Sequence, residues 1–119
     1  MIRALALTAL ALAAAPRDPL AGRVPGKPQQ CIPLSPNNGG TVIDRNTIIY
    51  PGGGGRLYKT GPVGPCPSLR PMTTLIVRVF GGQLCRNDLF STIEPGMSIP
   101  SAPCRFREFV PYARVKKPG

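Results

Sequence analysis

The sequence contains no histidine, and only five of its 119 residues are acidic. Histidine is the side chain that most often moves protons near neutral pH, so the commonest general acid–base group is missing. Of the five carboxylates, Asp44 and Asp88 could pair across a sheet as catalytic acids do. Each lies beside turn-forming residues, however, where a carboxylate ordinarily holds the backbone. We therefore expect no catalytic residues and no enzyme activity.

Closely spaced cysteine pairs are also missing. The four cysteines, Cys31, Cys66, Cys85 and Cys104, are separated by 35, 19 and 19 positions. Structural zinc sites bring ligands in pairs two to four residues apart, and a thioredoxin-like redox centre needs Cys-x-x-Cys. The glycine run at residues 52–55 lacks the Gly-Lys-Ser/Thr of a phosphate-binding loop. We expect no metal and no cofactor.

The chain has no apolar run long enough to cross a bilayer, which takes roughly 20 residues. Its longest run is "ALALTALALAAA", the twelve residues from Ala4 to Ala15, and it follows the positive charge of Arg3. A charged start, a short apolar stretch and small residues are typical of a secretory signal peptide. We assign residues 1–14 to this peptide and expect a chain exported to the periplasm or secreted, with no transmembrane segment.

Export places the cysteines where disulfides form and persist. An even number of cysteines in a short exported chain indicates a disulfide framework, and four cysteines allow three connectivities. A small domain is marginally stable on its core alone, and each disulfide adds about 2–4 kcal/mol. The four cysteines are therefore expected to form two structural disulfides.

Proline and glycine supply 16 and 14 of the residues. Four of the prolines fall in "PRDPLAGRVPGKPQQ", a stretch poor in apolar residues. This composition predicts a disordered Pro-rich linker over residues 15–30. The folded domain is then expected over residues 31–112, with a basic flexible tail at 113–119.

Within that domain the apolar residues favour strands. "TVIDRNTIIY" holds two β-branched runs around Asp44-Arg45-Asn46, which fits either one strand or a strand pair with a turn. "PGGGGR" predicts a hairpin tip, and "RLYKT" returns as the partner strand. "TTLIVRVF" reads as a buried strand and "DLFSTI" as another. No helical period stands out after residue 15. We expect an all-β fold: a small disulfide-stapled sandwich or partly open barrel of about five short antiparallel strands.

Positive charge dominates, with 15 Lys and Arg and a formal net charge of +10. Such a field favours anionic partners, although most of the arginines are scattered along the chain. A basic–aromatic patch is expected beside the glycine tip and a basic patch in the tail. The candidate anion-binding residues are Arg56, Tyr58, Lys59, Arg114, Lys116 and Lys117.

The order of landmarks resembles a family of small exported bacterial proteins of unknown function. The resemblance rests on "VIDRNTIIY", "GPCPSL", "LCRND" and "CRFREFVPY", which carry the patterns Cys-Pro-x-Leu, Leu-Cys-x-x-Asp and Cys-x-x-x-x-Phe. It extends from Cys31 to Tyr112 and departs from the family at Arg45 and Arg107. The resemblance implies that the cysteines are a scaffold, and it implies no activity, cofactor or catalytic residue.

Two disulfide pairings are left open. If the first and last elements lie side by side, Cys31 pairs with Cys104 and Cys66 with Cys85, which is the preferred pairing. The alternative joins Cys31 to Cys66 and Cys85 to Cys104.

Two functions follow from these residues as expectations. The first is an exported, non-catalytic binding or structural module at the cell envelope, with an unknown envelope component as its partner. The alternative is a binder of anionic polymers, such as lipid headgroups, acidic glycan or nucleic acid, through the basic surface.

Overall fold

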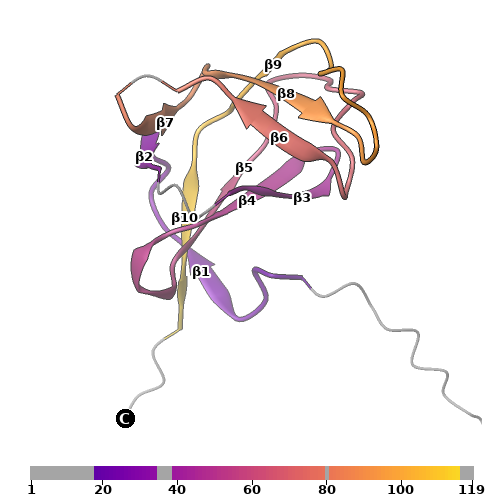
Figure 1. Ribbon diagram of the computed structural model, residues 1–119. Coiled ribbons are helices and arrows are strands. Elements are labelled where there is room, and N and C mark those ends of the chain that lie inside the picture. Colours follow the sequence, from indigo (N-terminus) through magenta and orange to yellow (C-terminus); the bar gives the residue numbers. More distant parts are fainter. Residues whose placement is uncertain (1–17, 35–38, 80, 116–119) are drawn as a thin grey trace, which may run out of the picture.

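The computed structural model describes residues 18–34, 39–79 and 81–115, which form an all-β domain (Figure 1). The expected signal peptide at residues 1–14 lies outside this part of the chain. The strands that the described residues form are β1 (Arg23–Pro25), β2 (Cys31–Pro33), β3 (Thr41–Asp44), β4 (Thr47–Pro51), β5 (Leu57–Thr60), β6 (Thr74–Val77), β7 (Gln83–Cys85), β8 (Leu89–Ile93), β9 (Cys104–Arg105) and β10 (Val110–Arg114).

These strands pair antiparallel in three sheets. The largest has the order β1-β10-β5-β4-β3, the second is the pair β2-β7, and the third has the order β6-β8-β9. In Figure 1 the three-stranded sheet lies over the β3-β4-β5 part of the large sheet, and the β2-β7 pair lies at one side. The all-β, disulfide-stapled fold class is confirmed, and none of the three sheets closes into a barrel.

The number of strands is larger than the expected five, for a local reason. β1, β2, β7 and β9 contain only two or three residues each, and β1 and β2 end in proline. Segments this short show no alternation that could be recognised in a sequence. They are strands because a neighbouring strand binds them, not because of their own propensity.

The meander β3-β4-β5 follows directly from its sequence. Asp44 begins the first turn, where its Oδ1 accepts a hydrogen bond of 2.8 Å from the Asn46 N–H. The second turn is a short 3-10 element, η1 (Gly53–Gly55), in which Gly54 and Gly55 have positive φ angles of 70° and 75°. Glycine adopts that backbone region without strain. The expected glycine hairpin is confirmed, and of the two alternatives for "TVIDRNTIIY" the structure shows the strand pair with a turn.

The segment that follows β5 connects the large sheet to the three-stranded sheet. Beyond the strand end, the Arg107 N–H donates to the Gly61 carbonyl and the Val63 N–H to the Arg105 carbonyl, each over 2.8 Å. Gly61 has no room for a side chain, since a Cβ there would lie 2.1 Å from the Asn46 carbonyl oxygen. Residues 105–107, at the end of β9, are thus hydrogen-bonded to the segment that follows β5.

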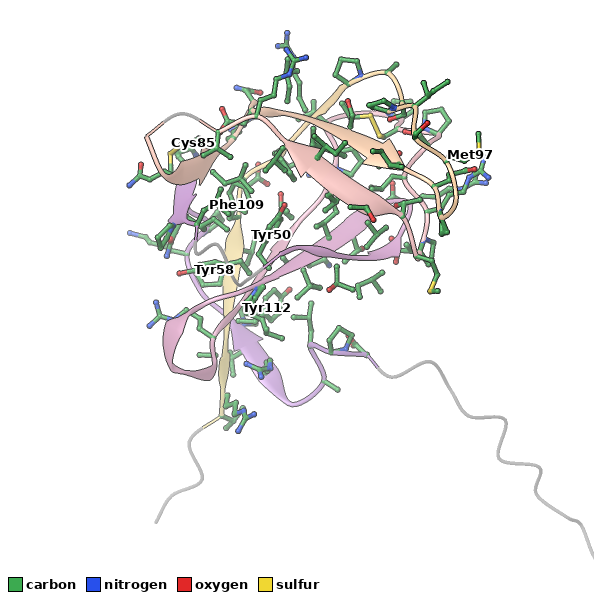
Figure 2. All side chains as sticks on the ribbon, viewed as in Figure 1. Tyr50, Tyr58, Cys85, Met97, Phe109 and Tyr112 are labelled. Carbon is green, nitrogen blue, oxygen red and sulfur yellow. A yellow bond between two sulfur atoms is a disulfide. The ribbon has the colours of Figure 1, made fainter. Side chains whose placement is uncertain are left out.

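The core lies between the sheets and is centred on aromatic rings. Phe106 is fully buried, and its ring centroid lies 4.3 Å from that of Phe90, 5.8 Å from that of Phe109 and 6.2 Å from that of Tyr50. Figure 2 shows Tyr50, Tyr58 and Phe109 inside the body of the domain, beside β5 and β10. Most of the few aromatic residues are therefore used for packing.

The strand expected in "TTLIVRVF" is present as β6, but it is not buried on both faces. It is an edge strand of the three-stranded sheet, and its residues alternate between exposed and half-buried. Ile76 points outward and is 38% exposed. A continuous apolar run does not distinguish a fully buried strand from an edge strand with one covered face.

Both expected disulfide pairings are wrong. The bonds join Cys31 to Cys85 and Cys66 to Cys104, which is the third connectivity. The first element does not lie beside the last cysteine. β2 instead pairs with β7, which places Cys31 directly opposite Cys85. Disulfide bonding of all four cysteines is confirmed.

The expected disordered linker at 15–30 is wrong for the part that the structure describes. β1 pairs with β10, with Val24 opposite Ala113, and Gln29 forms a bridge with Phe109. Residues 23–25 are ordered by an edge that β10 leaves open, which composition does not reveal. The same pairing extends the last strand to Arg114, so the expected domain end at residue 112 is too early. No helix among the described residues has the length and apolar character that crossing a membrane requires.

Candidate functional site

The outer face of the large sheet carries a basic face, defined here as Arg23, Lys59, Tyr112 and Arg114. Directly opposite residues of antiparallel strands project to the same side. Arg23 of β1 lies opposite Arg114 of β10, and Lys59 of β5 lies opposite Val110. Tyr112 lies between these two positions on β10. The core side of the same strands is marked by buried Tyr58 and Thr60, so the basic face points away from the core.

The glycine tip stands at one end of this face. A guanidinium nitrogen of Arg23 donates a hydrogen bond to the Gly55 carbonyl, and the Gly52 N–H donates to the Arg56 carbonyl over 2.7 Å. Arg56 itself is exposed at the end of the tip. The tip therefore ends in a fourth cation, Arg56, directly before β5.

The sequence assigned three of these cations to anion binding, and their positions are compatible with that assignment. Arg56 and Arg114 are exposed, and Lys59 is half-buried. Lys116 and Lys117 lie outside the described residues. Tyr58, in contrast, is 6% exposed and packs in the core, so its expected place in a solvent-facing patch is wrong.

Two residues of the basic face were missed by sequence reasoning. Arg23 lay in the segment expected to be disordered. Tyr112 replaces Tyr58 as the aromatic residue of the face, half-buried between Pro25 and Leu57. Its signal was present in "VPYAR", where valine, tyrosine and arginine alternate with smaller residues. Figure 2 shows Tyr112 on the β1 side of the buried aromatic residues.

Two hollows lie on this face, and Lys59 and Tyr112 line both of them. The first hollow has a volume of about 200 Å³ and the second about 480 Å³. The remaining residues of the first hollow are Asn46, Thr60, Gly61, Arg107, Glu108 and Val110. Those of the second hollow are Asp18, Leu20, Ile43, Asp44 and Thr47.

The cations of the basic face have no ion-pair partner within the described residues. The ion pairs formed there are Arg70 with Glu94, at 3.3 Å, and Arg107 with Glu108, at 4.0 Å. Neither involves Arg23, Lys59 or Arg114. Their charge is therefore available to a ligand.

The two carboxylates of the second hollow hold turns through one oxygen each. Asp18 Oδ1 accepts the Leu20 N–H over 3.0 Å, and Asp44 Oδ1 accepts the Asn46 N–H over 2.8 Å. The second oxygen of each carboxylate makes no hydrogen bond to a described residue. A ligand hydroxyl could donate to it. The second hollow thus combines hydrogen-bond acceptors, a cation at Lys59 and an aromatic ring at Tyr112.

Asp44 and Asp88, the carboxylate pair considered from the sequence, belong to different sheets. Asp44 ends β3 of the large sheet. Asp88 precedes β8 of the three-stranded sheet, and its Oδ2 accepts the Cys85 N–H over 2.7 Å. Both carboxylates hold turns, as their neighbouring residues predicted.

Comparison with protein-family models, with curated proteins and with solved structures finds no match to this chain. The resemblance to a family of small exported proteins therefore stays a prediction, and function has to be argued from the basic face itself.

Proposed function

We propose that the chain is an exported, non-catalytic binding module that holds an acidic glycan of the cell envelope along its basic face. One observation carries the proposal: Arg23 and Arg114 lie directly opposite each other on the outer face, and neither has a carboxylate partner among the described residues. Like charges opposite each other in a sheet destabilise it. An anion bound between them removes that cost.

The shape of the face favours a polymer over a single ion. The cations at Arg23 and Arg114 lie at one end, Tyr112 follows, and Lys59 with the two hollows lies beyond it. Strands rise about 3.3 Å per residue, so the path from Arg114 to Val110 covers about 13 Å. This length suits several sugar units in a row.

The chemistry of the second hollow favours a glycan over nucleic acid. The free oxygens of Asp18 and Asp44 accept hydrogen bonds from sugar hydroxyls, which a DNA backbone does not offer. Lys59, in the same hollow, attracts the carboxylate of an acidic sugar. Tyr112 offers a ring on which the apolar face of a sugar can stack. A polymer with both hydroxyls and carboxylates satisfies all of these groups.

Export is supported by two features. The first is the charged and apolar pattern of residues 1–14, and the second is the pair of disulfides, which form in oxidising compartments. The intact mass of the exported chain tests this part of the proposal. We expect cleavage after residue 13 or 14 and no thiol that reacts before reduction.

The binding experiment uses polygalacturonate as the probe, with neutral dextran, single-stranded DNA and anionic vesicles as competitors. We expect polygalacturonate to bind, dextran not to bind, and the affinity to fall as salt is raised. Arg114→Gln should weaken binding about tenfold, the loss expected for one charge-assisted contact.

The matched control is Arg86→Gln, which removes the same charge at an exposed position in the turn before β8. It should leave the affinity for polygalacturonate within about twofold. Equal losses for the two variants would show a response to net charge alone and would contradict a site on the basic face. Stronger binding of DNA or vesicles than of polygalacturonate would reject the glycan.

A further inference from the structure

A second arginine pair lies on the outer face of the three-stranded sheet. In β8, Phe90 and Thr92 are buried, so Leu89 and Ser91 project to the opposite face. Arg105 of β9 lies directly opposite Leu89. On the other side, Val77 pairs with Phe90, which places Arg78 opposite Leu89 as well.

The pairing of β6 with β8 continues by one more hydrogen bond, from Arg78 to Leu89. The Arg78 N–H donates to the Leu89 carbonyl over 3.1 Å, so the two residues are neighbours in the sheet. Adjacent strands lie about 4.8 Å apart, so Arg78 and Arg105 are separated by about 10 Å across Leu89. Two extended arginine side chains can close that gap on a single anion.

Both arginines are exposed and available for a ligand. The ion pairs formed by the described residues involve neither of them. Asp88, which precedes Leu89, directs its Oδ2 to the Cys85 N–H. Neither arginine beside Leu89 is therefore paired with a carboxylate among the described residues.

An apolar cavity opens beside this pair. Its volume is about 90 Å³, more than the space that one water molecule requires. Its lining is formed by Ile76, Leu89, Phe90, Pro100 and Pro103, together with Ser91 and Arg78.

The segment that carries Pro100 and Pro103, which line the cavity, is hydrogen-bonded to the sheet. The Ser101 N–H donates to the Thr92 carbonyl over 2.9 Å, and the Thr92 N–H donates to Ser101 Oγ over 2.9 Å. These bonds fix the segment between Pro100 and Pro103 against β8. The cavity is therefore part of the folded domain, with Ile76 partly exposed at its edge.

We propose that this face binds an amphiphile with one anionic headgroup and an aliphatic chain. The headgroup lies between Arg78 and Arg105 above Leu89, and the first carbons of the chain enter the cavity under Pro100 and Pro103. Charge complementarity selects the headgroup, and the apolar lining selects the chain. This site is on a different sheet from the basic face, so the proposal does not depend on glycan binding.

The test titrates the full mature chain with decanoate below its micelle concentration, using isothermal calorimetry and the amide NMR signals of Ser91 and Ile76. We expect saturable decanoate binding that shifts both signals, with acetate and decanol each binding at least tenfold more weakly. Acetate lacks the chain and decanol lacks the charge. Equal binding of acetate and decanoate would overturn the role of the cavity.

Variants distinguish binding at this site from a general response to positive charge. Arg78→Gln and Arg105→Gln should each weaken decanoate binding about tenfold, whereas Arg86→Gln should change it by less than twofold. Because both arginines are exposed, circular dichroism should show the native fold in every variant. Equal effects of all three substitutions would overturn the proposal.

A last arm distinguishes a free amphiphile from a membrane surface. Vesicles containing an anionic phospholipid are offered to the same variants. Decanoate binding that Arg105→Gln weakens supports the site, whether or not vesicles bind. Binding of vesicles without any binding of decanoate would overturn the proposal, since the face would then respond to surface charge alone.

Discussion

Arg23 and Arg114 occupy directly opposite positions in the β1-β10 pair, on the face of the sheet that points away from the core. Two like charges at such positions reduce the stability of a sheet. Since neither arginine forms an ion pair with a described residue, the cost is present in the unliganded protein. We propose that an anion bound between the two arginines offsets this cost.

The first prediction separates stability from binding at this position. Arg114→Gln should raise the free energy of unfolding by about 0.5 kcal/mol, because it removes a like-charge pair opposite Arg23. Equilibrium denaturation in urea at low salt measures this change. The gain should shrink as salt screens the charges. A loss of stability in Arg114→Gln would contradict repulsion between the two arginines.

The second prediction concerns the disulfides. Peptide mapping without reduction should recover Cys31 linked to Cys85 and Cys66 linked to Cys104. Replacing either pair by alanines should lower the free energy of unfolding by about 4 kcal/mol, as the loss of loop-closure entropy predicts for loops of 54 and 38 residues. That is a large share of a small domain's stability.

Denaturant unfolding of the two double variants measures these losses. Each variant should be largely unfolded at room temperature, or should unfold at a temperature close to it. A peptide linking Cys31 to Cys104 would disprove the strand pairing of β2 with β7, because that pairing puts Cys85 opposite Cys31.

The sequence predicted the local elements well, since their signals are local. The turn at Asp44, the glycine tip and the strand around Phe90 are encoded by turn residues and β-branched runs within a few positions. The two disulfides were expected from compartment and cysteine number. Pairing was not predictable, because no local signal in the three-residue β2 indicates that β7 is its neighbour.

The same limit of sequence-based prediction applies to single residues of the candidate site. Tyr58 and Lys59 lie on opposite faces of β5, which alternation predicts. Packing against β4 and the aromatic cluster decides which face of β5 is buried in the core. The sequence "LYKT" alone does not. Arg23 was missed because a strand of three residues that ends in Pro25 looks like a linker until its partner is known.

The third prediction uses Tyr50, whose burial raises the pKa of its phenol well above the usual value. The unfolded chain loses this proton near pH 10, whereas the folded chain keeps it. The folded state then binds more protons, so the free energy of unfolding falls as pH rises above about 10, by up to about 1.4 kcal/mol per unit. Below that pH, the contribution of Tyr50 to stability is fully present.

The variant Tyr50→Phe keeps the ring and its edge contacts with Phe106 and Phe109. Urea denaturation at pH 8, 10 and 11 measures the difference between the two proteins. We expect the wild type to lose more stability than the variant between pH 10 and 11. Parallel losses in the two proteins would rule out Tyr50 as the titrating group.

The fourth prediction compares two turns of the same design. The turns Arg70–Thr73 and Glu94–Met97 each have proline second, and their third residues, Met72 and Gly96, have φ angles of 74° and 78°. Only glycine adopts this conformation freely, and another residue loses about 1–2 kcal/mol there. Met72 is 83% exposed, so replacing its side chain costs little packing.

We therefore expect Met72→Gly to raise the free energy of unfolding by about 0.5 kcal/mol, after the added entropy of the unfolded chain is subtracted. Gly96→Ala should lower it by about 1 kcal/mol. Denaturant unfolding of both variants measures the two effects. Destabilisation by Met72→Gly would indicate that the Met72 side chain makes a contact in solution.

The most direct test of the central claim is an NMR titration of the mature chain with a short oligogalacturonate, following every backbone amide. Binding along the basic face predicts that the largest shifts fall at Arg23, Lys59, Tyr112 and Arg114, with small shifts at Arg86. Arg114→Gln should reduce them at equal ligand concentration. Shifts spread evenly over all exposed arginines, or no shifts at saturating ligand, would contradict the account.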